Sequence, residues 1–188
     1  MTRVDGAEAV ARAARVRLVA LDVDGTLTDG RLHIGGDGEA MKSFSVRDGF
    51  GLTLLREAGL HLTLVTARRS AIVQARADEL RIDDVLQGVA DKARALRALC
   101  ERHGVALDEC AFVGDDWPDL PALAIAGLAA TVADAPPEVR ARAHWVSTIP
   151  AGRGAVREFA EFVLRAQGAF DAALARYAGD PGVGASAA

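Results

Sequence analysis

Short runs of apolar residues alternate along the chain with stretches whose apolar positions follow a helical period. Five of the runs are rich in β-formers and predict buried strands, at residues 16–21, 61–65, 85–86, 110–113 and 128–132. Helical spacing or capping residues predict the intervening helices, at residues 51–58, 70–80, 92–103 and 154–167, with a short one opening at 136–137. This alternation indicates an α/β fold with a doubly wound, mostly parallel sheet covered on both faces.

One segment interrupts the alternation directly after the first predicted strand. Residues 29–44 hold two short extended runs around a Gly-Gly-Asp-Gly turn, which predicts an inserted β-hairpin. This hairpin is the only insertion that the sequence predicts, and it is too short to close over a site alone, so we expect no cap domain. We therefore expect a single domain over residues 1–170. The segment after Gly168 begins with a short helical pattern and ends rich in Gly, Pro and Ala, so we expect the tail, 171–188, to be partly disordered.

Composition narrows the setting of this domain. The 188 residues are 51% hydrophobic but only 5% aromatic, so the core must be aliphatic. A net charge of −4 gives no basic patch, and we expect neither nucleic acid nor a membrane as a partner. Two cysteines are too few for a disulfide framework, and no signal peptide or apolar span stands out. We expect a cytoplasmic protein.

Paired acidic residues stand directly after the first predicted strand. Asp22 and Asp24 lie two positions apart, which brings both carboxylates to one side of an extended chain, and Gly25 permits the sharp turn that follows. Close carboxylates repel each other unless a cation or a shared proton relieves them, and Mg²⁺ prefers such oxygen ligands. A turn rich in Asp and Gly without function would give the same motif, so both interpretations stay open for this motif alone.

A second acidic motif follows the fourth predicted strand. The sequence GDDWPD holds Asp115, Asp116 and Asp119. Ligand sites of open α/β sheets form at the carboxyl edge where the strand order reverses. If the first and fourth strands are neighbours, Asp22, Asp24 and Asp115 surround one point. Asp116 could instead cap a helix, and Asp119 could be a solvated acid of a first helical turn.

Two further residues fall at the same predicted edge. Thr66 ends the second strand, where a hydroxyl and free backbone N–H groups could hold a phosphate oxygen. Lys92 opens the helix after the third strand. Each residue alone is typical of a helix cap or a solvated helix. The two acidic motifs, Thr66 and Lys92 all fall at strand ends or at the start of the following helix. Together they indicate one site for phosphate and metal.

This ordered set, DxDGT followed by a hydroxyl, a lysine and GDD with a further Asp, resembles the haloacid dehalogenase superfamily of phosphoryl-transfer enzymes. Three longer segments carry the resemblance across about residues 16–170: DVDGTLTDGRLHIGGDGEAMKSFSVRDGFGL, VGDDWPDLPAL and AGRGAVREFAEFVLRAQG. They are similar to the capless subclass that removes phosphate from 3-deoxy-D-manno-octulosonate 8-phosphate in lipopolysaccharide sugar synthesis. The resemblance implies a Rossmann-like fold, a Mg²⁺ cofactor, a sugar-acid phosphate substrate and a homotetramer.

The resemblance also implies roles for the acidic residues. Asp22 would be the nucleophile that forms an aspartyl-phosphate, and Asp24 would protonate the leaving group and then activate water. Mg²⁺ would bind Asp22, Asp115 and the backbone carbonyl of Asp24.

The remaining matched residues would bind the phosphate or support the site. Thr66 and Lys92 would hold the phosphoryl oxygens. Asp116 and Asp119 would act behind the metal ligands, holding metal-bound waters or orienting Lys92.

Recognition of a sugar acid also requires a group that binds a carboxylate, for which arginine offers a bidentate fork. Arg68 is the first candidate because it stands beside the predicted phosphate site, and Arg47 is the second. Arg47 could equally pair with Asp48 or face solvent, and Arg153 is left unassigned. Ala67 stands where the family often has glycine, and its methyl group would either narrow the approach of the sugar or change the loop.

Other functions remain open. A close relative acts on 3-deoxy-nonulosonate 9-phosphate in the synthesis of sialic-acid-like sugars, and the sequence barely separates the two substrates. A phospho-signalling receiver domain also combines acids, a Thr and a Lys, but it lacks the DxDGT turn. A non-catalytic interaction subunit does not need the complete acidic set. A phosphomutase usually has a cap domain, which is not visible in this chain.

The missing cap predicts a role for the hairpin. By the resemblance, hairpins of a homotetramer associate and adjoining subunits wall the site. The apolar residues that would build this interface are Leu32, Ile34, Met41 and Phe44.

Overall fold

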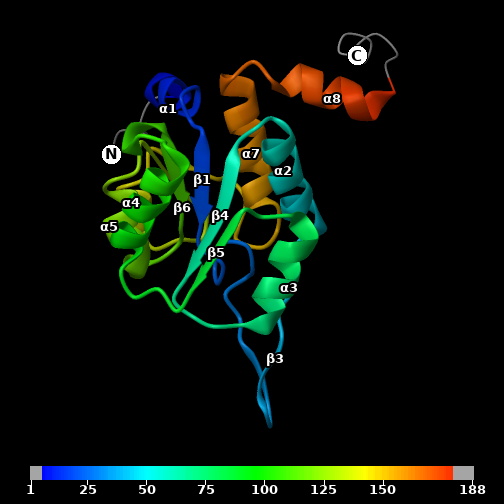
Figure 1. Cartoon of the computed structure of the whole chain (residues 1–188), viewed down its shortest axis with the longest axis vertical. Helices are drawn as coiled ribbons and strands as arrows, with labels where there is room; N and C mark the ends of the chain where they lie inside the picture. Colours follow the sequence, from blue (N-terminus) through cyan, green and yellow to red (C-terminus); the bar gives the residue numbers. More distant parts are fainter. Residues whose placement is uncertain (1–5, 180–188) are drawn as a thin grey trace.

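A six-stranded sheet in the order β5-β4-β1-β6-β7-β8 forms the centre of the computed structural model, which describes residues 6–179 (Figure 1). Every neighbouring pair of strands in this sheet runs parallel. The strands are β1 (Leu18–Leu21), β4 (His61–Thr66), β5 (Asp84–Gln87), β6 (Cys110–Val113), β7 (Leu128–Thr131) and β8 (Trp145–Val146). The doubly wound α/β fold predicted from the sequence is confirmed, and β8 is the strand that the sequence did not predict.

Helices cover both faces of the sheet. They are α1 (Gly6–Ala13), α2 (Val46–Glu57), α3 (Ala71–Leu80), α4 (Lys92–His103), α5 (Leu120–Leu123), α6 (Pro137–Arg140), α7 (Ala155–Ala166) and α8 (Phe170–Ala178). In Figure 1, α2, α3 and α7 lie on one side of the sheet, and α4 and α5 lie on the other. The chain runs outward from β1 first to β4 and β5 and then to β6 and β7, and right-handed crossovers in opposite directions place their helices on opposite faces.

Side chains of the central strand β1 supply both halves of the core. Val19 and Leu21 belong to the cluster that includes residues of α2 and α7, whereas Leu18 and Ala20 belong to the cluster that includes residues of α4 and α5. This division follows from the alternation of side chains along a strand. All four residues are buried. That burial explains why the strand is a continuous apolar run in the sequence.

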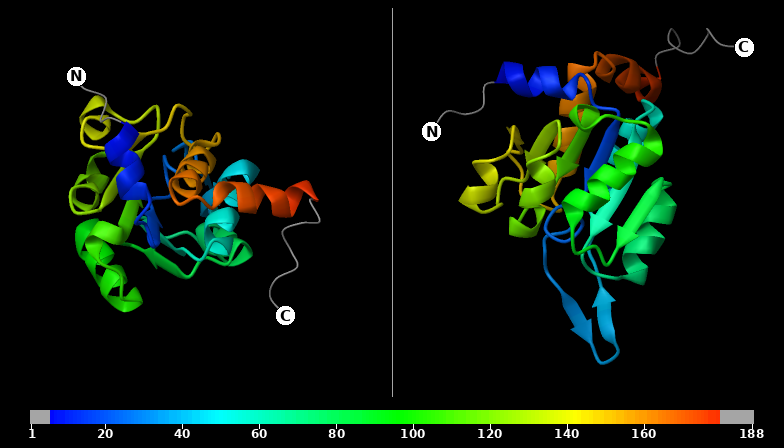
Figure 2. Two further views of the ribbon diagram at one scale, coloured as in Figure 1. Left: turned by 90° about the horizontal axis from the view of Figure 1, so that it is seen from above. Right: turned by 60° about the vertical axis from the view of Figure 1, so that its left-hand side comes forward.

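The predicted hairpin insertion is present as β2 (His33–Gly35) and β3 (Gly38–Met41), an antiparallel pair joined by a two-residue turn. Figure 2 shows it extending away from the body of the domain, beyond the carboxyl ends of the sheet strands. Its exposed apolar side chains are Leu32, Ile34 and Met41. Phe44, which we expected on the same apolar face, is instead partly buried against the core cluster of α2 and α7.

Helix α2 begins at Val46, five residues before the predicted start. Ser45 caps the helix, because its side chain accepts a hydrogen bond from the backbone N–H of Asp48. Glycines within residues 46–51 interrupt the helical pattern of apolar residues at the start of α2. A Cβ atom at Gly51 would lie only 2.9 Å from Cα of Arg157 on α7. The close approach of α2 and α7 therefore requires a residue that weakens the helical signal in the sequence.

The two terminal helices were less predictable. The sequence did not predict α1, although Ala9 and Ala13 are buried. Helix α8 confirms the short helical pattern after Gly168 and extends beyond residue 170, where we expected the domain to end. The remainder of the predicted tail, 180–188, lies outside the described residues. Across residues 6–179, the helices are too short or too polar to cross a bilayer.

Candidate active site

The first acidic motif continues from β1 into a tight turn. The backbone N–H of Asp22 donates to the carbonyl of Val113 over 2.9 Å, so the chain stays paired with β6 one residue beyond the strand. The backbone N–H groups of Thr26, Leu27 and Thr28 then all donate to the carbonyl of Val23, at 3.3, 3.0 and 3.1 Å. This turn leaves the carboxylate of Asp22 buried at the carboxyl edge of the sheet.

The second acidic motif folds around Asp119. Its Oδ2 accepts hydrogen bonds from the backbone N–H groups of Asp115 and Asp116, at 2.9 and 3.1 Å. Asp119 is only 1% exposed, so the alternative of a solvated acid is wrong for this residue. Asp116 caps the short 3-10 helix Trp117–Asp119 through a 2.8 Å hydrogen bond from the N–H of Trp117, as the alternative interpretation expected.

Glycines in both motifs leave room for the carboxylates. A Cβ atom at Gly25 would lie 2.2 Å from Oδ2 of Asp115, and its φ of +94° also disfavours other residues. A Cβ atom at Gly114 would lie 2.5 Å from Cγ of Asp119. Thr26 then donates a 3.0 Å hydrogen bond from Oγ1 to Oδ1 of Asp115. The two motifs therefore fit against each other and hold Asp115 beside the first turn.

Three carboxylates and one ammonium group converge at this edge. Asp22, Asp115 and Asp119 each offer an oxygen within 4.8 Å of the others. Nζ of Lys92 lies 2.7 Å from Oδ1 of Asp22 and 2.5 Å from Oδ1 of Asp119. Lys92 is the first residue of α4, so the start of this helix delivers the ammonium group to the site. The strand neighbours that the sequence argument required are confirmed, because β1 pairs with β6.

The charges at this site are poorly balanced. Burial, and after it the charge of Asp119, raise the pKa of Asp22 from 3.8 to about 6, although Lys92 acts to lower it. Burial together with Asp22 and Asp119 raises the pKa of Asp115 to about 8. Burial alone would lower the pKa of Lys92, but the two carboxylates it contacts raise it. Three buried acids facing one ammonium group form an oxygen-rich set that fits a hard divalent cation.

Asp24 does not belong to that group of carboxylates. Its Oδ1 is bound by the ammonium group of Lys42, which also lies 2.8 Å from Oε1 of Glu39. Nε of Arg68 lies 4.0 Å from Oδ2 of Asp24. Sequence reasoning missed Lys42, because a single lysine at the end of an exposed hairpin is typical of a solvated residue.

Thr66 and Arg68 lie at the same edge, at the end of β4. Leu64 pairs with Leu21, so Thr66 lies two residues beyond the last residue of β1. Thr66 is buried, and its Oγ1 accepts a 3.3 Å hydrogen bond from the backbone N–H of Arg68. The Arg68 side chain is about half exposed, at 46%. It therefore reaches both solvent and the surroundings of Asp24.

Arg47 is not drawn into the acidic cluster. It is exposed on the first turn of α2 and, within the described residues, forms no ion pair with another side chain. Together with Arg153 and Arg157 it lines a hollow of about 400 Å³. The pairing with Asp48 considered above is not present. The buried Asp48 carboxylate instead accepts hydrogen bonds from the N–H groups of Gly154 and Arg157, at 3.1 and 2.8 Å, and so fixes the start of α7.

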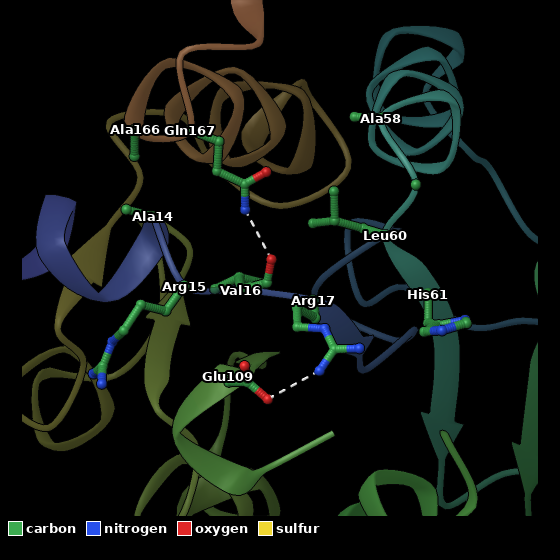
Figure 3. A pocket seen from close by; sticks show the side chains of 11 residues that line it. Ala14, Arg15, Val16, Arg17, Ala58, Leu60, His61, Glu109, Ala166 and Gln167 are labelled. Carbon is green, nitrogen blue, oxygen red and sulfur yellow. Dashed lines mark hydrogen bonds and ion pairs between the residues drawn. The ribbon is translucent and has the colours of Figure 1, made fainter. Parts of the chain in front are cut away.

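A different hollow, of about 690 Å³, lies at the opposite edge of the sheet (Figure 3). Its polar groups bond mainly to one another. Arg17 pairs with Glu109 at 3.3 Å, and Nε2 of Gln167 donates to the carbonyl of Val16 over 2.8 Å. The Arg17 and Glu109 side chains are 55% and 31% exposed. This hollow therefore lacks the buried, crowded charges of the carboxyl edge.

A parallel sheet with Asp22 at its reversal point, a second acidic motif beside it and Lys92 between them defines a class of phosphoryl-transfer enzyme. A family model described as haloacid dehalogenase-like hydrolase matches residues 82–158. Together with relatives that are about 40% identical over 89% of the chain, this match shows that the chain belongs to the haloacid dehalogenase-like hydrolase family.

Within that family the chain is similar to 3-deoxy-D-manno-octulosonate 8-phosphate phosphatases. KdsC of Escherichia coli K12 is 40% identical over 167 residues, which cover 89% of each chain. The crystal structure of the phosphatase from Moraxella catarrhalis, with magnesium ion, phosphate ion and KDO, has a TM-score of 0.88 at 41% identity and covers 90% of this chain and 98% of that one. The cobalt-bound phosphatase of Haemophilus influenzae has a TM-score of 0.83 at 39% identity, covering 85% and 93%. The family resemblance predicted from the sequence is confirmed.

Proposed function

We propose that the protein is a Mg²⁺-dependent phosphatase that hydrolyses 3-deoxy-D-manno-octulosonate 8-phosphate in lipopolysaccharide sugar synthesis. The observation that carries this proposal is the buried convergence of Asp22, Lys92, Asp115 and Asp119 at the carboxyl edge of the sheet. The substrate assignment is supported by the similarity to KdsC over 89% of the chain. The same similarity favours the eight-carbon over the nine-carbon sugar acid.

The acidic cluster is the proposed metal site. Asp22, Asp115 and the backbone carbonyl of Asp24 would hold Mg²⁺, and Asp119 lies close enough to support it. A bound cation would offset the charge repulsion between the carboxylates and an incoming phosphate. The magnesium ion and phosphate ion in the Moraxella catarrhalis phosphatase support this assignment.

The first chemical step would form a covalent intermediate. The carboxylate of Asp22 attacks phosphorus, the bond from phosphorus to the sugar oxygen breaks, and an aspartyl-phosphate forms. Asp24 donates a proton to the leaving sugar oxygen. Lys92 and Thr66 bind the phosphoryl oxygens, where developing negative charge meets the ammonium group and the hydroxyl.

The second step would release phosphate. Asp24, now ionised, takes a proton from a water molecule as that water attacks phosphorus, and the bond to Asp22 breaks. Asp119 would hold Lys92 in place throughout, since its Oδ1 contacts the ammonium group while its Oδ2 accepts two backbone hydrogen bonds. Asp116 would contribute by capping the short helix that carries Asp119.

The carboxylate of the sugar acid would bind Arg68. Its position beside Thr66 and Asp24, with a half-exposed guanidinium group, supports this role. Arg47 is the second candidate and would act from the start of α2. Ala67 would narrow the approach of the sugar between these groups.

We further propose that the protein is a cytoplasmic homotetramer. The exposed side chains of Leu32, Ile34 and Met41 on the projecting hairpin support an interface between hairpins, with adjoining subunits walling the site. The unlinked, buried Cys100 and Cys110 support a reducing compartment. Sedimentation analysis that found a fully active monomer would contradict the tetramer.

The proposed function is tested by phosphate release from a panel of sugar phosphates, with Mg²⁺ and with EDTA. The panel includes the eight- and nine-carbon 3-deoxy sugar-acid phosphates and simple hexose phosphates. We expect turnover only with Mg²⁺ and a clear preference for the eight-carbon substrate. Equal rates on every phosphomonoester would contradict a dedicated substrate, and equal rates in EDTA would contradict the metal site.

A further inference from the structure

We infer that Lys42 is a positioning residue that holds Asp24 in place for proton transfer to the leaving sugar oxygen. This inference rests on the proposed function, in which Asp24 is the general acid. It assigns the hairpin insertion a part in the chemistry of its own subunit, in addition to any role in assembly.

Lys42 is buried and fully engaged by acids. Its side chain is 1% exposed, and its ammonium group contacts Asp24 and Glu39. Because this ammonium group is already bound by two carboxylates of the protein, Lys42 acts on the reaction through the carboxylates it holds. Burying a lysine is unfavourable unless it is paired, and here two acids pair with it.

The pairing of Lys42 leaves one oxygen of Asp24 available. Lys42 binds Oδ1, whereas Oδ2 is buried and has no hydrogen-bond partner among the described residues. An unpartnered buried carboxylate oxygen is unusual and indicates a ligand or a reactive role. In the proposed reaction, Oδ2 carries the proton that passes to the sugar oxygen as its bond to phosphorus breaks. By holding Oδ1, Lys42 therefore orients Oδ2 of Asp24 for this proton transfer.

The hairpin is held against the domain through Glu39, the second carboxylate that Lys42 contacts. The hydroxyl of Ser70 donates to Oε2 of Glu39 and also accepts a 3.3 Å hydrogen bond from the N–H of Val73, as the N-cap of α3. The N–H of Ser70 donates to Oε1 of Gln87 on β5 over 2.6 Å. A continuous set of contacts thus runs from α3 and β5 through Glu39 and Lys42 to Asp24.

The composition of the chain supports a specialised use of lysine. Of the 22 Lys and Arg residues, only Lys42 and Lys92 are lysines. Both are buried, and each ammonium group contacts two carboxylates at the site. Surface positive charge is supplied by arginine throughout.

The test compares two substrates whose leaving groups differ in their need for a proton. The parameter kcat/KM reports the steps through formation of the aspartyl-phosphate. A sugar alkoxide must be protonated as it leaves, whereas p-nitrophenolate leaves without a proton. For Lys42→Met we expect kcat/KM to fall on the order of 10²-fold with the sugar phosphate, the size of a general-acid contribution, and only a few-fold with p-nitrophenyl phosphate.

Two variants complete the design. Asp24→Asn must show the same selectivity with a larger loss. Arg31→Met removes an exposed cation of the hairpin insertion that, among residues 6–179, pairs only with Asp29, at 3.7 Å, and it must leave kcat/KM unchanged with both substrates. Circular dichroism checks folding. If Lys42→Met does not fold, Lys42→Arg applies the same comparison, because its larger planar group displaces Asp24 while keeping the charge.

The outcomes separate the inference from the function on which it rests. Equal losses on both substrates for the Lys42 variant, with selective loss for Asp24→Asn, would mean that Lys42 only stabilises the hairpin and would overturn the inference. Unchanged activity of the Lys42 variant would also overturn it. Equal losses for Asp24→Asn would instead overturn the proposed role of Asp24 as the general acid.

Discussion

Both edges of the sheet carry charged side chains, but these side chains are exposed to water at the amino edge and buried at the carboxyl edge. At the amino edge, Arg17 and Glu109 form an ion pair that stays largely open to water (Figure 3). At the carboxyl edge, Asp22, Lys92 and Asp119 are packed together out of solvent. Exposed pairs contribute about 0–1 kcal/mol to stability, whereas buried like charges are unfavourable until a cation joins them. The edge with the poorly balanced charges is therefore the one that requires a functional explanation.

The largest effect is expected from Asp22→Asn. An amide is not a nucleophile, so phosphate release should fall on the order of 10⁴-fold or more. The metal-free variant should unfold at the same temperature or higher, because one of the crowded charges is gone. Phosphate-release assays and thermal unfolding in EDTA measure the two effects. Near-normal activity would show that another residue attacks phosphorus.

Lys92→Met should affect both activity and stability. Loss of the ammonium group removes a contact to the phosphoryl oxygens, and kcat should fall about 10²–10³-fold. It also leaves Asp22 and Asp119 buried without their partner, which should lower the free energy of unfolding by about 3–5 kcal/mol in the metal-free protein. Denaturant unfolding with and without Mg²⁺ measures this, and a smaller deficit is expected with the metal. A stability loss unaffected by Mg²⁺ would argue against a metal beside Lys92.

The pH dependence of the metal-free protein provides a third test. The pKa values of Asp22 and Asp115 are raised from 3.8 to about 6 and about 8 in the folded chain. Raised pKa values mean that the folded state binds more protons, so stability should fall as pH rises from about 4 to 8. Thermal unfolding in EDTA should show this decline. The stabilisation by saturating Mg²⁺ should accordingly be larger at high pH than at low pH, and a constant difference would contradict the assignment.

The smallest effect is expected at the amino edge. Arg17→Ala removes the exposed pair with Glu109 and should change the free energy of unfolding by less than about 1 kcal/mol. Activity and metal affinity should remain unchanged. A substantial loss of kcat/KM in this variant would show that the two edges are coupled and that the contrast between them is incomplete.

Much of this contrast could be predicted from the sequence, because the end of an apolar run shows where a strand ends. The runs before Asp22 and Asp115 predict two strands, and parallel topology brings their carboxyl ends together. The pairing of Lys92 with Asp119 was included only as one alternative, since buried and solvated helix residues look alike in sequence. Lys42 could not be predicted, because its contact with Asp24 depends on where the end of the hairpin, directly after β3, meets the turn that follows β1.

The apolar pattern predicted the secondary structure correctly where an element is long. The prediction failed where packing overrides the local preference of the sequence. Helix α4 was predicted to the residue, with Gly104 as its left-handed C-cap. The start of α2 was missed because Gly49 and Gly51 weaken the helical pattern, and Gly51 is required by the close contact with α7. Strand β8 is two residues long, Trp145 and Val146, and is too short to show any periodicity.

The rarity of lysine makes the site directly observable. Because Lys42 and Lys92 are the chain's two lysines, incorporation of ¹⁵N- or ¹³C-labelled lysine would place spectroscopic probes beside the proposed acid and the proposed nucleophile and at no other side chain. Two side-chain resonances, each assignable by a single substitution, would then follow metal binding, phosphorylation and hydrolysis separately at the two carboxylates.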